Sequence, residues 1–214
     1  MLKIWGRKSS SNVQAAMWCI GELGLAYERI DAGFTYGVVD TPEYLSLNPN
    51  GTVPTLQDGQ EAPIWETAAI LRYLSDRYGS EEFWPRDSIE RASIDMWAEW
   101  AKVNIALNFT EPVFWRVVRT PPSKRDWHAI GQALKALGKF MNLAENKLSG
   151  SPFLAGDHFT LADIQFGHVL FRYFDIDIDR TNFPEVRRYY EALTTRDAYQ
   201  KHVMVSYDEL RVAD

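Results

Sequence analysis

The spacing of hydrophobic and polar positions along the chain changes near residue 80. Before that point, short apolar runs alternate with helical stripes. Residues 2–5 (LKIW) form an apolar run that ends at Gly6, which predicts a short buried strand. Apolar residues then recur at helical spacing over 13–23, and Gly24 is typical of a helix end. This half of the chain therefore mixes strands and helices.

The rest of the first half also alternates between predicted strands and predicted helices. The patterns predict a strand over 27–31, one or two helical turns over 41–47, a hairpin of 53–56 and 62–65 around Asp58-Gly59, and a helix that ends at Gly79. This order mixes parallel and antiparallel pairing.

After Gly79 the pattern becomes helical. A polar connector covers 80–87, and no convincing strand follows it. One helical stripe consists of Ile89, Met96, Trp100, Val103 and Leu107; a second consists of Ile130, Leu134, Leu137, Met141, Ala144 and Leu148. Pro112 is expected to kink or end the first of these helices, and further helices are expected near Thr160 and Pro184. We therefore predict an α/β domain over 1–80 and an all-α domain over 88–214.

Composition narrows the choice of function. The net charge of −6 makes neither nucleic acid nor a membrane surface an expected partner, and no apolar run approaches the roughly 20 residues of a membrane span. The single cysteine, Cys19, excludes an internal disulfide, and the four histidines show no metal-ligand spacing. Glycine-rich phosphate loops are absent. We expect a cytoplasmic protein that needs no metal and no nucleotide.

The most specific local signal is FLAGDHFTLADI at 153–164. Thr160 and Asp163 have the spacing of a capping box, in which each side chain satisfies a main-chain donor at a helix start. Phe159 and Ile164 occupy the positions of a hydrophobic staple. Asp163 is also a candidate acid or base, but capping explains it better. We interpret this segment as a folding element.

Together with three other stretches, this segment resembles the cytosolic glutathione transferases. The stretches are WGRKSSSNV at 5–13, LNPNGTVPTL at 47–56 and WETAAILRYL at 65–74, and FPEVRRYYEAL at 183–193 is similar to a late helix of the family. The opening is similar to bacterial members that use Ser or Thr in place of Tyr. The resemblance implies a thioredoxin-like N-terminal domain, a helical-bundle C-terminal domain, a homodimer, a role in detoxification and glutathione as co-substrate.

The resemblance assigns the thiol chemistry to the turn at 9–12. Ser10 aligns with the catalytic Ser or Thr, and Asn12 aligns with an Asn that contributes in some disulfide-reducing relatives. Lowering a thiol pKa by about two units requires roughly 2.7 kcal/mol, and one hydrogen bond to a charged group contributes roughly 1.5–3 kcal/mol. A single hydroxyl therefore suffices for most of the effect. The alternative is a simple turn in which Ser11 or Asn12 caps the helix.

The remaining expected glutathione contacts are Thr52, Val53, Pro54, Glu66 and Thr67. Val53-Pro54 resembles the family's step with a cis proline, next to which main-chain groups pair with glutathione. Glu66-Thr67 opens a helix, where free main-chain donors suit a carboxylate. Thr52 stands where relatives often have Lys or Arg, which weakens the expected hold on glutathione.

The resemblance also implies a second-substrate pocket at Trp115, Arg116 and Arg119, where the two arginines would favour acidic electrophiles. A solvated face and a core contact explain these three residues equally well. Cys19 lies mid-helix, away from the nucleophile position of cysteine-type relatives, so we expect a buried apolar role for it. Three functions remain open at this point. They are conjugation of glutathione to an electrophile, glutathione-dependent reduction of disulfides or peroxides, and binding without catalysis.

Overall fold

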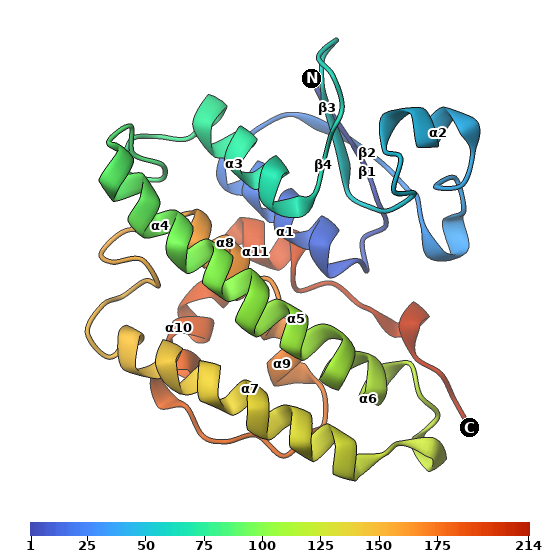
Figure 1. Cartoon of the computed structure of the whole chain (residues 1–214), viewed down its shortest axis with the longest axis vertical. Coiled ribbons are helices and arrows are strands. Elements are labelled where there is room, and N and C mark those ends of the chain that lie inside the picture. Colours follow the sequence, from blue (N-terminus) through green and yellow to red (C-terminus); the bar gives the residue numbers. More distant parts are fainter.

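A four-stranded sheet forms the core of the N-terminal half. The computed structural model describes residues 1–214, and its strands are β1 (Leu2–Trp5), β2 (Tyr27–Ile30), β3 (Thr55–Asp58) and β4 (Ile64–Trp65). Their order is β2-β1-β3-β4, with β1 parallel to β2 and antiparallel to β3. This mixed sheet, with helices against it, is thioredoxin-like (Figure 1).

Three helices accompany the sheet: α1 (Ser11–Glu22), α2 (Pro42–Leu47) and α3 (Thr67–Tyr78). The predicted hairpin is confirmed, and Gly59 turns it with a φ of 59°. Its first strand starts at Thr55 and not at Val53, so the prediction was two residues early. The reason is Pro54, which lacks a main-chain donor and stands just before the strand.

The C-terminal half is a bundle of helices. They are α4 (Ser88–Trp100), α5 (Leu107–Phe109), α6 (Arg116–Val118), α7 (Trp127–Leu148), α8 (Leu161–Gly167), α9 (Leu170–Asp175), α10 (Pro184–Thr194) and α11 (Asp197–His202). The sequence predicted α4, α7, α8 and α10 but missed the short helices α9 and α11. None of the helices is long and apolar enough to cross a membrane.

Of the two outcomes expected for Pro112, a kink or the end of a helix, the helix end does not occur. The chain stays helical from α4 to α6 through two π-helical segments, Ala101–Ala106 and Thr110–Trp115. Pro112 lies inside the second segment. A π-turn widens the helix locally and changes which carbonyl each donor meets, so the helix continues past the missing donor.

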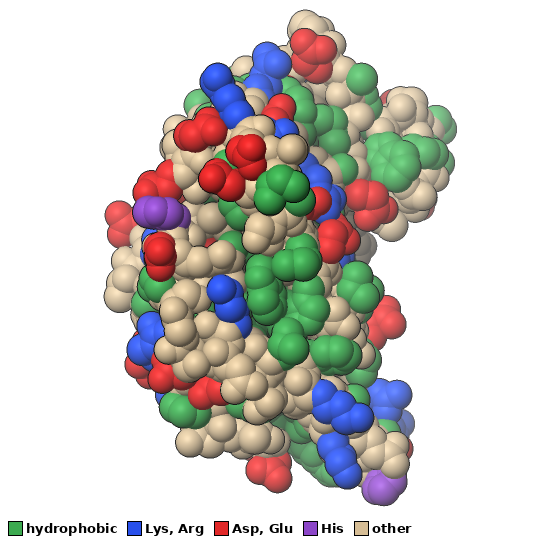
Figure 2. Space-filling model, turned by 60° about the vertical axis from the view of Figure 1, so that its left-hand side comes forward, with side chains coloured by type: hydrophobic (Ala, Val, Ile, Leu, Met, Phe, Trp, Pro, Cys, Tyr) green, Lys and Arg blue, Asp and Glu red, His purple; other side chains and the backbone are tan.

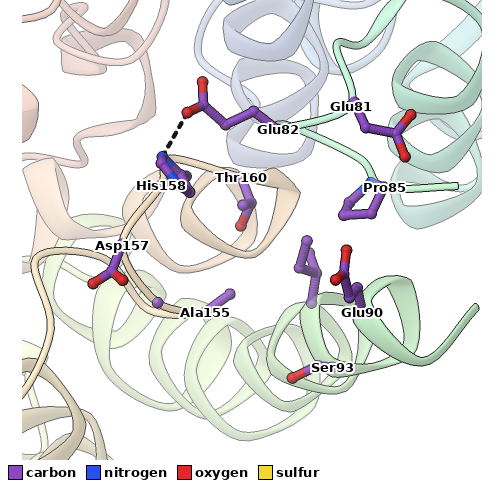
Figure 3. A pocket seen from close by; sticks show the side chains of 11 residues that line it. Glu81, Glu82, Pro85, Glu90, Ser93, Ala155, Asp157, His158 and Thr160 are labelled. Atoms are coloured by element: carbon purple, nitrogen blue, oxygen red, sulfur yellow. Dashed lines mark ion pairs between the residues drawn. The ribbon is translucent and has the colours of Figure 1, made fainter. Parts of the chain in front are cut away.

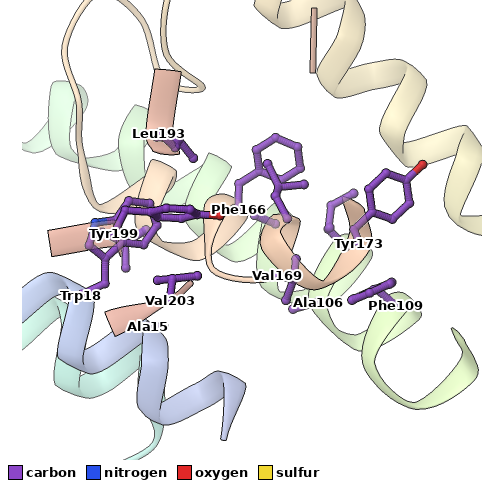
Figure 4. Close-up of a cluster of buried hydrophobic side chains, with 14 of the residues drawn as sticks. Ala15, Trp18, Ala106, Phe109, Phe166, Val169, Tyr173, Leu193, Tyr199 and Val203 are labelled. Atoms are coloured by element: carbon purple, nitrogen blue, oxygen red, sulfur yellow. The ribbon is translucent and has the colours of Figure 1, made fainter. Parts of the chain in front are cut away.

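The two halves share one hydrophobic core. Trp18 of α1 meets the ring of Tyr199 edge-on at 4.7 Å and that of Phe159 at 5.5 Å. Figure 4 shows this cluster continuing from α1 through α8 and α9. Arg196 adds a bidentate pair to Glu22, with distances of 2.8 and 2.6 Å. The N-terminal half is thus held firmly against the bundle.

The predicted capping box is confirmed at the start of α8. The Asp163 carboxylate accepts hydrogen bonds from the main-chain N–H groups of Thr160 and Leu154, at 2.8 and 2.9 Å. The Tyr189 hydroxyl donates to it at 2.8 Å. Asp163 is completely buried, so all its polar capacity serves the fold.

Candidate functional site

The turn between β1 and α1 presents three consecutive serines. Ser9 is 2% exposed, and its hydroxyl donates to Glu209 and accepts from Arg7 Nε at 3.1 Å. Ser10 is the N-cap residue of α1, yet its half-buried side chain makes no capping hydrogen bond. Ser11 is the first residue of α1 and is also half-buried. The hydroxyl of Ser9 is therefore already engaged, whereas those of Ser10 and Ser11 are available.

Asn12, on the first turn of α1, has a partner that the sequence analysis missed. Lys102 Nζ donates to Asn12 Oδ1 at 2.9 Å, across 90 positions of sequence. Burial lowers the pKa of the Lys102 ammonium, and the nearby carboxylates of Glu66 and Glu99 oppose this shift. Neither Asn12 nor Ser11 caps α1, so the simple capping alternative does not describe this turn.

The turn before β3 rests on a buried polar network. The Tyr44 hydroxyl and Asn48 Nδ2 both donate to the Thr52 carbonyl, at 2.6 and 2.9 Å. The Thr52 side chain is exposed, and the Val53-Pro54 bond is cis, as predicted. The main-chain N–H and C=O of Val53 have no partner within the chain. They are free to pair with an extended ligand.

The start of α3 offers a second set of free main-chain donors. Glu66 adopts a φ of 70°, which is rare for a residue with a side chain; this conformation costs free energy and persists only where the surroundings enforce it. No side chain caps this helix. The N–H groups of Thr67 and the two residues after it therefore have no partner within the chain. Such a helix start is suited to a carboxylate.

Two arginines lie close to one aromatic ring beside the serine turn. The guanidinium carbons of Arg7 and Arg119 lie 5.3 and 5.2 Å from the centre of the half-exposed Phe34 ring. Arg119 also lies 4.7 Å from the Trp115 ring, and its buried Nε has no hydrogen-bond partner. Arg116 is exposed, and no ion pair or aromatic contact joins it to this group.

The C-terminal segment completes this region, which local sequence patterns did not reveal. Glu209 reaches Ser9 across 200 positions. Arg172, on α9, donates from Nη2 to the Ser9 carbonyl at 2.6 Å. Both residues lie in segments without any recognisable motif. Only the path of the chain brings them to the turn.

A cavity of about 450 Å³ lies elsewhere, between the connector after α3, the start of α4 and the loop before α8. Four of its eleven lining residues are acidic, and Figure 3 shows the ion pair between His158 and Glu82 at its edge. No predicted site residue lines it. We therefore do not assign the glutathione chemistry to this cavity.

Cys19 is buried inside α1, as expected. Burial raises the pKa of its thiol to about 12. A thiol of this kind is protonated near neutral pH and is a poor nucleophile.

Comparisons with known proteins agree with this geometry. The family model for the glutathione S-transferase N-terminal domain matches residues 1–76, and the model for the C-terminal domain matches residues 109–197. Glutathione S-transferase GstB of Escherichia coli is 34% identical over 206 residues, covering 96% of this chain and 99% of that protein. Glutathione S-transferase 3 of Zea mays is 31% identical over 209 residues, covering 94% of this chain and 93% of that protein.

The structural comparison gives the same answer. The theta-class glutathione S-transferase of Xanthomonas axonopodis pv. citri with glutathione bound superposes with a TM-score of 0.90 at 41% identity. The match covers 96% of this chain and 98% of that one. The chain belongs to the glutathione S-transferase family.

Proposed function

We propose that this transferase binds glutathione across the serine turn, the Thr52–Pro54 turn and the start of α3, and activates the thiol through Ser10. The observation that carries the assignment is the division of roles in the turn. Ser9 is engaged by Glu209 and Arg7, whereas the Ser10 hydroxyl next to the helix start is free. Glutathione is the nucleophile, and the electrophile is a small molecule.

The energetics fit one hydroxyl at this place. A hydrogen bond from Ser10 to the thiolate contributes roughly 1.5–3 kcal/mol. The N-terminus of α1 adds roughly 0.3–1 kcal/mol for a nearby negative charge. Together they are comparable to the roughly 2.7 kcal/mol that lowers a thiol pKa by about two units. Asn12, held by Lys102, keeps its amide donors for the same sulfur.

The remaining contacts of glutathione follow from the free main-chain groups. We assign the cysteinyl unit to the main chain of Val53 next to Pro54, and the γ-glutamyl carboxylate to Glu66-Thr67 at the start of α3. Thr52 offers an exposed hydroxyl but no charge to the glycine carboxylate. The domain limits that go with this assignment are 1–80 for the glutathione-binding domain and 88–214 for the helical domain.

An ultraviolet pH titration of the thiolate in the glutathione complex tests the assignment. We expect a thiol pKa well below that of free glutathione in the natural protein, and a return towards the free value in Ser10→Ala. Ser11→Ala is the matched control and should leave the shift in place. If Ser11→Ala abolishes the shift instead, the hydroxyl is that of Ser11. Bound glutathione with an unshifted thiol would contradict the proposal and favour a binding protein without catalysis.

For the second substrate we propose an acidic electrophile. Arg7 and Arg119 lie close to the Phe34 ring, Arg119 also lies close to Trp115, and the half-buried Arg119 guanidinium offers a positive charge to an anion. Arg116 stays a prediction, because no contact joins it to this group. A role in detoxification in the cytoplasm agrees with this chemistry, since glutathione keeps thiols reduced there.

We also propose a homodimer. Ile89, Met96 and Val103 follow one another at seven-residue spacing, and all three are exposed, as is Leu107. Hydrophobic side chains gather in the middle of the face in Figure 2, and contiguous exposed apolar surface of this kind marks an interface. Met96→Glu should give monomers in light scattering. Leu143→Glu, at another exposed apolar position, on α7, is the control and should not change the mass.

A second candidate function is glutathione-dependent reduction of disulfides or peroxides. The observation that favours it is the bond that fixes Asn12, the residue that the resemblance connects with such chemistry. A substrate panel separates the two reactions. Conjugation predicts higher turnover with organic halides, and disulfide turnover that exceeds it by orders of magnitude would favour reduction.

A further inference from the structure

Arg172 is a buried cation without a counter-charge. Its side chain comes from α9 and is 3% exposed, and no carboxylate forms an ion pair with it. The guanidinium carbon lies 4.7 Å from the centre of the Phe114 ring and 5.6 Å from that of Tyr207. Its Nε has no partner. The single hydrogen bond of this group is the one from Nη2 to the Ser9 carbonyl, at 2.6 Å.

A buried charge with so few partners lowers the stability of the folded protein. Taking an ion out of water costs several kcal/mol even after relaxation, and a hydrophobic residue of similar volume is often as stable or more so. Of the neighbouring groups, Tyr207 favours the charged form, whereas Arg7 and Arg119 are positive and add repulsion. The carboxylate at this turn is that of Glu209, which accepts a hydrogen bond from the Ser9 hydroxyl and not from Arg172. Burial lowers the pKa of Arg172 to about 9, so the group stays mainly protonated near neutral pH. Fold stability alone does not account for this cation.

The location of its hydrogen bond indicates a role. The acceptor carbonyl belongs to the residue directly before Ser10, and α1 begins one residue later. A positive charge on the inner side of this turn acts through a low-dielectric interior, where its field is less screened than in water. The outer side of the turn is where the proposed function puts the glutathione sulfur.

We propose that Arg172 is a positioning residue that holds the serine turn through the Ser9 carbonyl and, as a fixed positive charge behind that turn, favours the thiolate over the thiol. This inference rests on the proposed function. It adds a second source of thiolate stabilisation, independent of the Ser10 hydroxyl. The Arg172 side chain itself does not touch the substrate.

The test compares Arg172→Met, Arg172→Gln and Arg172→Lys by thiolate titration of the glutathione complex and by kcat/KM for an aryl halide from pH 6.5 to 9.5. Arg172→Met should raise the thiol pKa by about one unit, which lowers the thiolate fraction and kcat/KM about fivefold at pH 6.5 and far less at pH 9.5. Arg172→Lys should restore most of the shift. Arg172→Gln keeps a donor without the charge and should resemble Arg172→Met, so it serves also if the latter does not fold.

Arg180→Met is the matched control. Arg180 is half-buried near the same helix and donates from Nε to the Tyr173 carbonyl at 2.6 Å, away from the serine turn. It should leave the thiol pKa unchanged. An equal loss of kcat/KM at every pH in Arg172→Met and Arg172→Gln, with an unshifted thiol pKa, would overturn the inference and leave the proposed function intact. A natural protein that does not ionise glutathione would overturn both.

Discussion

Two buried charges in the helical half are treated in opposite ways. Asp163 and Arg172 are both almost inaccessible to water. Around Asp163 stand the main-chain N–H groups of Leu154 and Thr160 and the hydroxyls of Thr160 and Tyr189. Arg172 has one carbonyl and an unpartnered Nε. The first charge is enclosed by donors, whereas the second is left largely unsatisfied.

The number of hydrogen-bond partners distinguishes a buried charge with a structural role from one with a functional role. A buried polar group that is fully hydrogen-bonded strengthens and specifies the fold. A buried charge that lacks partners lowers stability. Such a charge is therefore a candidate for a role in function, because the fold alone gains nothing from it. Asp163 lies in the capping box of α8, and Arg172 lies behind the serine turn. The following predictions test this contrast, starting with the largest effect.

Removing the enclosed charge should be strongly destabilising. Asp163→Ala leaves several buried donors without an acceptor, each of which costs about 1–3 kcal/mol, so the free energy of unfolding should fall by at least about 3 kcal/mol. Urea denaturation measures this. Asp126→Ala removes an exposed N-cap that accepts from Ala129 N–H, and it should cost only about 1 kcal/mol. Equal losses in the two variants would contradict the contrast.

The next effect concerns the half-buried guanidinium of Arg119. If it binds an acidic electrophile, Arg119→Ala removes a charged hydrogen bond worth roughly 1.5–3 kcal/mol, or about ten- to a hundredfold in kcat/KM for that substrate. Steady-state kinetics with a halogenated carboxylic acid and its neutral amide measure the difference. Arg116→Ala, which removes an exposed arginine, is the control. Equal losses on the acid and the amide would disprove the role of the charge.

A third buried ionisable group, His168, avoids the cost of a buried charge because it stays neutral. Burial, with Lys102 and Arg172 nearby, lowers the pKa of His168 to about 3. The unfolded chain therefore binds a proton below about pH 6.5 that the folded chain refuses, and stability falls as the pH decreases. From pH 7.5 to 5.5 this histidine should account for a loss of about 1.4 kcal/mol.

His168→Gln tests this directly. Urea denaturation at both pH values should show a loss smaller by about that amount than in the natural protein. His202, whose pKa burial lowers to about 4, should still contribute its share in the variant. An unchanged pH dependence in His168→Gln would show that the folded protein accepts a proton at this site.

The smallest expected change in stability, that of Arg172→Met, gives the clearest comparison with Asp163→Ala. Arg172→Met loses one hydrogen bond but also the cost of the buried charge, so its free energy of unfolding should change by less than about 1 kcal/mol. The same urea experiment as for Asp163→Ala measures it. A loss of 3 kcal/mol or more would make Arg172 a structural residue like Asp163.

Many features of the fold follow from residues that are close together in the sequence. The helix patterns, the Thr160–Asp163 box and the turn at Gly59 depend on residues three or four positions apart, so their chemistry can be recognised without a structure. Pattern and resemblance together were enough to predict the two-part fold and the family. Local rules also have limits: of the kink or helix end expected at Pro112, the end does not occur, because a π-helical segment continues past that residue.

Only the tertiary structure decided which charges meet at the serine turn. Lys102 reaches Asn12 across 90 residues, Arg172 reaches Ser9 across 163, and Glu209 reaches Ser9 across 200. No periodicity links such positions, because each contact depends on how whole helices pack against the sheet. For the same reason, the engaged Ser9 and the free Ser10 cannot be distinguished in the string SSS, where all three hydroxyls are chemically identical.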